Sequence, residues 1–150
     1  MYTIHVEKTL DMPIEKAFEA ITDHQNYSLY VGIKEANLLR SGDNEKNGTG
    51  AIRQIKAGGM TLQEEITEFQ KPTRMAYRII SAKPVGMIHP VGTINLSPVG
   101  DKTKVVWHSE FGFRFPVIGQ WLDNWFGPKF SKAFSVLLRG MEKRYHFFNR

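Results

Sequence analysis

Apolar and polar residues alternate on both sides of a Gly-Gly pair at positions 58–59, which is the pattern of a β-hairpin with a two-residue turn. In that register, residues 51–57 pair with residues 60–66. Because side chains along a strand point alternately to opposite faces, one face of this hairpin is mostly apolar and the other mostly polar. The apolar face is therefore expected to be buried. It also carries Arg53 directly opposite Glu64.

A second hairpin is predicted around Gly100-Asp101, because glycine suits the first position of a type II′ turn. Pairing outward from this turn gives a second apolar face, formed by Leu96 with Val105, Ile94 with Trp107, Gly92 with Ser109 and Pro90 with Phe111. The reverse face is mostly polar and includes His108. Two hairpins with one apolar face each indicate an antiparallel sheet that is covered on one side.

The remaining strands and the first helices follow from turn residues and from helical spacing. In addition to the second hairpin, strands are predicted at residues 3–10, 34–41, 49–56, 60–69 and 75–81. A helix begins at Pro13, which suits a first turn, and a short second helix is predicted at 27–30. A four-residue turn at 71–74 places Tyr77 on the inner face of the sheet, opposite Glu68.

Apolar residues at helical spacing predict a long C-terminal helix that covers the sheet, with Pro128 in its first turn. Its stripe consists of Phe130, Phe134, Leu137, Met141, Tyr145 and Phe148. Glycines 119 and 127 bracket most of the aromatic segment that precedes it. We interpret Trp121, Leu122 and Trp125 in that segment as a lid over a cavity, the alternative being that they belong to the core. Membrane contact through them would be transient at most, because Asp123 and Asn124 weaken the segment as an anchor.

Composition places the chain among globular proteins. Its 150 residues suit a single domain spanning 1–150, with 41% hydrophobic and 23% charged residues. The absence of cysteine excludes disulfides and thiolate chemistry, and neither a secretory signal nor a membrane span is visible, so a cytoplasmic location is expected. The net charge of +5 permits nucleic acid as a partner. However, the basic residues near the C-terminus mostly avoid the apolar stripe, as on a solvated helix face, and we expect no nucleic-acid partner.

The candidate chemistry centres on the polar residues of the inner face. A buried charge is costly unless it is paired, so Arg53 and Glu64 are expected to form an ion pair. With Tyr77 and Ser109 they would be the polar members of an apolar interior, which is the make-up of a ligand pocket. Two interpretations remain open: the pair either anchors a ligand or satisfies only itself. Gly92 is equally open, as a gap for a ligand or as the mark of a β-bulge.

The case for catalysis is weaker, and no catalytic residue is assigned. Because His108 points outward, no histidine is expected beside Ser109, and a nucleophilic serine would lack its base. Glu64 could act as a general base if a substrate displaced Arg53, although an arginine partner lowers the pKa of a carboxylate. The five histidines show no metal-ligand spacing, so neither a metal nor a cofactor is expected.

Several stretches carry a resemblance to a known superfamily: LDMPIEKAFEAITDHQNY near the start, GTGAIR, RMAYRII with Tyr77, and TKVVWHSEF. The chain resembles the START-like or SRPBCC superfamily, and most closely its polyketide cyclase/dehydrase and lipid-transport branch. The resemblance implies an α+β helix-grip fold, with a curved antiparallel sheet of about seven strands around a long C-terminal helix and two short helices after the first strand.

The resemblance also implies a cavity between the sheet and the long helix, where members bind hydrophobic or amphipathic molecules. We therefore expect this protein to bind a small molecule of that kind, with its transport or sequestration as further options. The expected ligand-binding residues are Arg53, Glu64, Tyr77, Trp107, Ser109, Phe111, Phe134 and Met141. A cyclase, dehydratase or isomerase that uses the same cavity is the alternative, and a binder of membrane surfaces or nucleic acid is the third.

Overall fold

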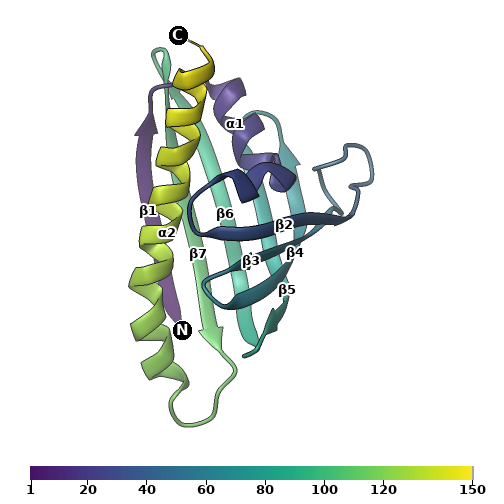
Figure 1. Ribbon diagram of the computed structural model, residues 1–150, viewed down its shortest axis with the longest axis vertical. Helices are drawn as coiled ribbons and strands as arrows, with labels where there is room; N and C mark the ends of the chain where they lie inside the picture. Colours follow the sequence, from purple (N-terminus) through teal and green to yellow (C-terminus); the bar gives the residue numbers. More distant parts are fainter. Residues whose placement is uncertain (150) are drawn as a thin grey trace.

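A computed structural model describes residues 1–149 and places seven strands in one antiparallel sheet, in the order β1-β7-β6-β5-β4-β3-β2 (Figure 1). The elements are β1 (Tyr2–Leu10), α1 (Ile14–Thr22), the 3-10 helix η1 (His24–Leu29), β2 (Ile33–Arg40), β3 (Ile52–Ala57), β4 (Met60–Gln70), β5 (Arg74–Lys83), β6 (Met87–Val99), β7 (Lys102–Phe113) and α2 (Gly119–Phe148). The predicted α+β helix-grip architecture is confirmed, including the two short helices after the first strand.

The long helix α2 runs along the length of the sheet and packs over the side formed by β1 and β7 (Figure 1). The short helices α1 and η1 lie towards the end of the molecule where the C-terminus is found (Figure 1). Apolar side chains from both layers fill the space between them and form one core cluster. Ile94 and Val105 of the sheet and Leu138 of α2 are fully buried in it. The interior therefore contains the two predicted apolar hairpin faces and the predicted helix stripe from Phe130 to Tyr145. Phe148 is the exception, because its side chain is 64% exposed.

The register of both hairpins agrees with the prediction at the positions that matter for the site. Arg53 lies opposite Glu64 in the β3–β4 pair, which turns through glycines 58 and 59, both with positive φ. Ile94 lies opposite Trp107 in the β6–β7 pair, and Gly92 lies opposite Ser109. Alternation and the turn glycines were therefore sufficient to place these residues on the inner face.

One pairing in the β4–β5 hairpin differs from the prediction. Tyr77 lies opposite Ile66, and Glu68 lies opposite Ala76, because a register shift falls between residues 66 and 68. Tyr77 nevertheless points inward and is buried, as expected. Glu68 lies at the surface, where its Oε2 is 2.6 Å from Nε of Arg74.

A second irregularity, in β6, has a larger consequence. The register shifts between Ile88 and Val91, so that His89 and Pro90 together face Phe111, and the predicted pair of Pro90 with Phe111 is wrong. Proline has no backbone N–H to donate to a neighbouring strand and is tolerated at a bulge. The extra residue turns His89 to the inner face, where it is buried.

The C-terminal helix is longer than predicted, because residues 119–127 belong to it and do not form a separate segment. Gly127 does not end a helix. A Cβ at this position would lie 2.4 Å from the ring of Tyr2, so the glycine allows β1 to approach α2 closely. Pro128 lies inside the helix. Among the described residues, no helix is long and apolar enough to cross a membrane.

Candidate functional site

A cavity of about 400 Å³ lies between the inner face of the sheet and α2. Most of the side chains around it are apolar, and its polar members include Arg53, Glu64, Tyr77, His89 and Ser109. The cavity wall also includes exposed residues from three places: Val31 before β2, Gly58 in the β3–β4 turn and Lys129 on α2. The cavity therefore reaches the surface between α2 and these two turns.

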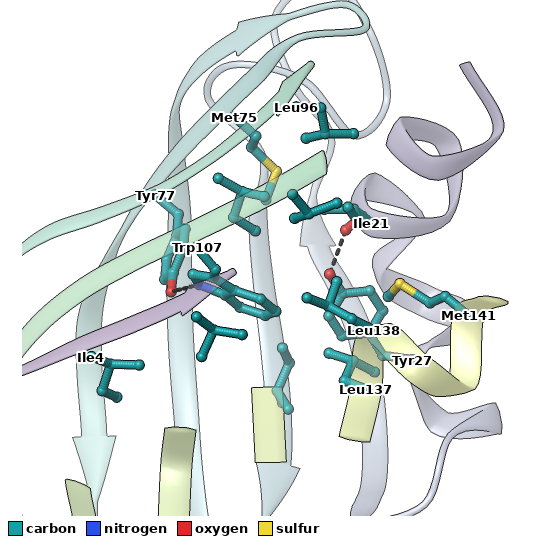
Figure 2. Packing of buried hydrophobic residues seen from close by; sticks show 14 of the residues in the cluster. Ile4, Ile21, Tyr27, Met75, Tyr77, Leu96, Trp107, Leu137, Leu138 and Met141 are labelled. Atoms are coloured by element: carbon teal, nitrogen blue, oxygen red, sulfur yellow. Dashed lines mark hydrogen bonds between the residues drawn. The ribbon is translucent and has the colours of Figure 1, made fainter. Parts of the chain in front are cut away.

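Most of the residues predicted to bind a ligand surround this cavity. They are Arg53, Glu64, Tyr77, Trp107, Ser109, Phe111 and Phe134. The indole of Trp107 stacks on the ring of Phe134, with 4.0 Å between the ring centroids, and so joins the sheet to the helix. Met141 is the exception. It lies two turns beyond Phe134 along α2 and is buried in the core near Tyr27 and Leu138 (Figure 2).

The three residues predicted as a lid do not line the cavity. Relative to Phe130, Trp121 is rotated by about 180° and Trp125 by about 140° around a helix of 3.6 residues per turn, so both project from the opposite face. Their side chains are accordingly 63% and 51% exposed. Leu122 is partly buried and packs against the core. The prediction of a separate lid segment is therefore wrong.

Phe126, Lys129, Phe130 and Ala133 of α2 do line the cavity, and only Phe130 belonged to the predicted stripe. Spacing could have identified Phe126, because it continues the series of Phe130 and Phe134 at intervals of four residues. The ammonium group of Lys129 lies over the exposed indole ring of Trp125, with Nζ 4.4 Å from the ring centroid.

Arg53 and Glu64 form an ion pair in the cavity wall. Nε and Nη2 of Arg53 donate to the same carboxylate oxygen of Glu64, Oε2, at 3.0 and 2.7 Å. Arg53 is 1% exposed and Glu64 is 6% exposed. Burial alone would lower the pKa of Arg53, but the carboxylate of Glu64 raises it above its ordinary value, so the guanidinium remains charged.

Two residues of η1 complete the surroundings of Arg53. Nη1 of Arg53 donates to Nδ1 of His24, a fully buried histidine. Burial, and then the positive charge of Arg53, hold the pKa of His24 well below its ordinary value. The rings of Tyr27 and Tyr77 lie on the guanidinium, with centroids 5.1 and 5.7 Å from its central carbon. Arg53 thus connects η1, β3, β4 and β5 through buried contacts.

His89 and Ser109 form a hydrogen-bonded pair that the sequence prediction missed. Nε2 of His89 lies 2.9 Å from Oγ of Ser109, and Nδ1 accepts a hydrogen bond from the backbone N–H of Ile79 at 3.1 Å. Burial lowers the pKa of His89, so the ring is neutral near neutral pH. Because the N–H of Ile79 can only donate, the proton of the neutral ring is on Nε2, which donates to Ser109.

This tautomer decides the chemistry of the pair. A histidine that activates a serine nucleophile must accept the hydroxyl proton, whereas Nε2 of His89 already carries one. The expectation that no histidine lies beside Ser109 is therefore wrong, but the pair still lacks the orientation of a nucleophile and its base. The bulge at residues 89–90 is what brings these two side chains together.

Tyr77 is the central polar residue of the cavity. Nε1 of Trp107 donates to its hydroxyl oxygen at 2.8 Å (Figure 2). Its ring stacks on that of His89, with 5.2 Å between centroids. Burial, and then the charge of Glu64, raise the pKa of Tyr77 above its ordinary value, so its hydroxyl stays protonated.

Gly92 provides the room for the stack of Tyr77 on His89, since a Cβ there would lie 2.6 Å from His89 and 2.7 Å from Tyr77. It marks neither a gap for a ligand nor the bulge itself.

Residues 1–149 contain no cluster of histidine, aspartate and glutamate that could hold a metal ion. The polar groups inside the cavity are instead one ion pair with one carboxylate oxygen unused, two hydroxyls, and the neutral ring of His89, which is hydrogen-bonded to Ser109. They suit hydrogen bonding to one end of an otherwise apolar molecule.

Comparison with known proteins identifies the sequence family. The family described as "Polyketide cyclase / dehydrase and lipid transport" matches residues 1–145. A search of curated proteins found no match.

Solved structures show the same fold at low sequence identity. A protein from Thermus thermophilus is 18% identical and has a TM-score of 0.76, with 95% of this chain and 96% of that one covered. A START superfamily protein from Mycobacterium smegmatis is 11% identical, with a TM-score of 0.76 over 95% of this chain and 99% of that one. The ZhuI aromatase/cyclase from Streptomyces sp. R1128 is 16% identical, with a TM-score of 0.71 over 96% of each chain.

Proposed function

The chain belongs to the polyketide cyclase/dehydrase and lipid transport family, and on that premise we propose that it binds a small hydrophobic or amphipathic molecule in the cavity between the sheet and α2. The observation that carries the proposal is the cavity itself. Its volume of about 400 Å³ falls within the range of roughly 300–1,000 Å³ that is typical of small-molecule sites. An apolar wall with a few convergent polar groups is also typical of such sites.

The geometry suits a ligand that enters between α2 and the two turns. Aromatic side chains from both layers, such as Trp107, Phe111 and Phe134, supply the apolar contact. The polar groups of Glu64, Tyr77 and Ser109 lie among them and would orient the ligand. Arg53 has a different role, because its N–H groups are directed to Glu64 and His24. It would act by holding Glu64 in position.

Filling the cavity tests this function. Ala57 lines the cavity, and the preceding residue, Lys56, points to the outer face, where its Nζ is 2.9 Å from Glu35. Ala57→Phe should reduce the binding of a small, neutral fluorescent probe such as 1-aminonaphthalene by about tenfold or more, and Lys56→Phe should leave it unchanged. Melting temperatures of both variants would verify that each is folded. Equal affinity of the two variants would show that the probe binds elsewhere and would contradict the proposal.

A cyclase-type enzyme is the second candidate, favoured by the structural similarity to an aromatase/cyclase and by two types of group in the cavity. Tyr77 offers a hydroxyl donor that could polarise a carbonyl, and Glu64 offers a carboxylate that could accept a proton. Incubation of the protein with a short poly-β-ketone, followed by mass spectrometry of the products, tests this candidate. Loss of turnover in Glu64→Gln, with the cavity still able to bind 1-aminonaphthalene, would assign the base.

A further inference from the structure

The two carboxylate oxygens of Glu64, in the polar wall of the cavity, differ in their hydrogen bonding. Both N–H groups that Arg53 directs at Glu64 bind Oε2. No group within residues 1–149 donates to the other oxygen, Oε1, and this oxygen is not among the fully enclosed polar atoms that lack a partner. An ionised carboxylate oxygen can only accept hydrogen bonds. The cavity therefore presents an unused, negatively charged acceptor.

The positive charge of Arg53, beside Glu64, is not accessible to a ligand in the same way. Arg53 is 1% exposed and is enclosed by the rings of Tyr27 and Tyr77 and by His24. Its charge is already compensated by Glu64 at 2.7 Å. A ligand carboxylate would have to displace Glu64, which would leave a second carboxylate unpaired in an apolar cavity, and that is a costly arrangement.

Tyr77 and Ser109 provide the complementary group. Each hydroxyl oxygen already accepts an N–H, that of Tyr77 from Trp107 and that of Ser109 from His89. The two hydroxyls also interact with each other, but a hydrogen bond between them uses only one of their two O–H protons. The other O–H proton is left without an acceptor among the described side chains. Because both residues line the cavity, this O–H is a donor for an oxygen of the ligand.

We infer that the cavity selects a neutral amphipathic molecule whose polar end carries a hydroxyl group, which donates to Oε1 of Glu64 and accepts from the spare O–H of the Tyr77–Ser109 pair, and that it rejects carboxylates. This inference rests on the proposed binding function and specifies its ligand class. A cavity of about 400 Å³ has the volume of roughly a dozen water molecules at about 30 Å³ each, which limits the ligand to about that number of non-hydrogen atoms.

Three probes of matched size test the inference. 1-Nonanol and 1-methoxyoctane are isomers that differ in the presence of a hydroxyl donor, and nonanoate adds an ionised carboxylate. Binding can be followed by the fluorescence of Trp107 in the Trp121→Phe, Trp125→Phe background, because both exposed tryptophans lie outside the cavity. One hydrogen bond to a charged group predicts that nonanol binds about ten- to hundredfold more tightly than the ether near neutral pH. Nonanoate should bind most weakly.

The variant Glu64→Gln should reverse the preference. The glutamine side chain is neutral, so Arg53 would lose its counter-charge, and nonanoate should then bind more tightly than nonanol. If this variant does not fold, the comparison of the two isomers on the wild-type cavity still decides. Equal binding of the two isomers, or tighter binding of nonanoate, would overturn the inference while leaving the binding function intact. Failure of all three probes to bind would instead overturn the binding function, and the inference with it.

Discussion

At the scale of single residues, the unusual feature is a fully buried arginine that has partners on every side. Arg53 donates to Glu64 and His24 and lies between two tyrosine rings. Of the two interpretations that the sequence left open, the contacts of Arg53 favour a structural pair. Those of Glu64 favour a ligand anchor, because Oε1 remains unused. We propose that the pair divides the two roles, with Arg53 holding Glu64 in position and Glu64 contacting the ligand.

Removing the arginine alone should harm the fold more than removing the pair. Arg53→Met leaves a buried carboxylate without its partner, which should lower the free energy of unfolding by about 3–5 kcal/mol. The double variant Arg53→Met, Glu64→Leu strands no charge. It should lose only about 1–3 kcal/mol, because His24 still loses its donor. Urea unfolding measures both values. A double variant as unstable as the single one would show that the stranded carboxylate is not the cause.

His24 should make the stability depend on pH. Its pKa is held well below the ordinary value of 6.5 in the folded protein, because the ring is buried and faces Arg53. Below pH 6.5 the unfolded chain binds a proton that the folded chain does not, so stability is retained above this pH and falls as the pH decreases. The loss is about 1.4 kcal/mol per pH unit for one such histidine, and His89, whose pKa is also lowered, adds to it.

Substitution of His24 identifies its share of this dependence. In His24→Asn, the slope of unfolding free energy against pH below about 6.5 should decrease by about 1.4 kcal/mol per pH unit, which corresponds to one proton. Identical slopes in wild type and His24→Asn would mean that His24 is not neutral in the folded protein.

At the scale of elements, the sequence pattern predicted strand pairing correctly wherever residues alternate strictly between the two faces of the sheet. The Gly58-Gly59 turn and the alternation around it gave the register of β3 and β4, and with it the position of Arg53 opposite Glu64. The same reasoning failed for His89, because counting in twos assumes that no residue is inserted. Pro90 was the available signal, since a proline in a strand favours an edge or a bulge.

The prediction of where α2 begins was wrong for a different reason. Gly127 was interpreted as a boundary, whereas its role is to admit the ring of Tyr2, a contact between residues far apart in the sequence. Such a contact leaves no local signal. The two exposed tryptophans of this part of α2 lie outside the cavity, and transient contact with a membrane through them stays a prediction.

Adjacent residues on α2 should differ sharply in their effect on binding. Phe126 lines the cavity, and Trp125 projects into solvent. Phe126→Ala should weaken the binding of 1-nonanol about tenfold, equivalent to about 1.4 kcal/mol of lost apolar contact. Trp125→Ala should leave the affinity unchanged, although it removes a side chain of similar size. Titration by calorimetry compares the two. A stronger effect of Trp125→Ala would restore the interpretation of this segment as a lid.

At the scale of the whole molecule, the fold divides the interior into a packed end and an open end. Near α1 and η1, Leu138 and Met141 of α2 pack with Tyr27 in the core (Figure 2). Towards the start of α2, the helix and the sheet are separated by the cavity, which reaches the surface at Val31, Gly58 and Lys129. The helix-grip fold could be anticipated from the sequence. The wall of the cavity depends on one bulge, for which Pro90 was the local signal, and on one continuous helix, in which Gly127 is explained only by its contact with Tyr2.

The central claim is that a small amphipathic molecule binds inside this cavity, and the indole N–H signals of the three tryptophans test it in one nuclear magnetic resonance titration. Trp107 lines the cavity and donates to Tyr77, whereas Trp121 and Trp125 are exposed on the far side of α2. Addition of 1-nonanol to the ¹⁵N-labelled protein should shift the signal of Trp107 in a saturable manner and leave the other two in place. Movement of the Trp121 and Trp125 signals with that of Trp107 unchanged would place the ligand on the surface and contradict the account.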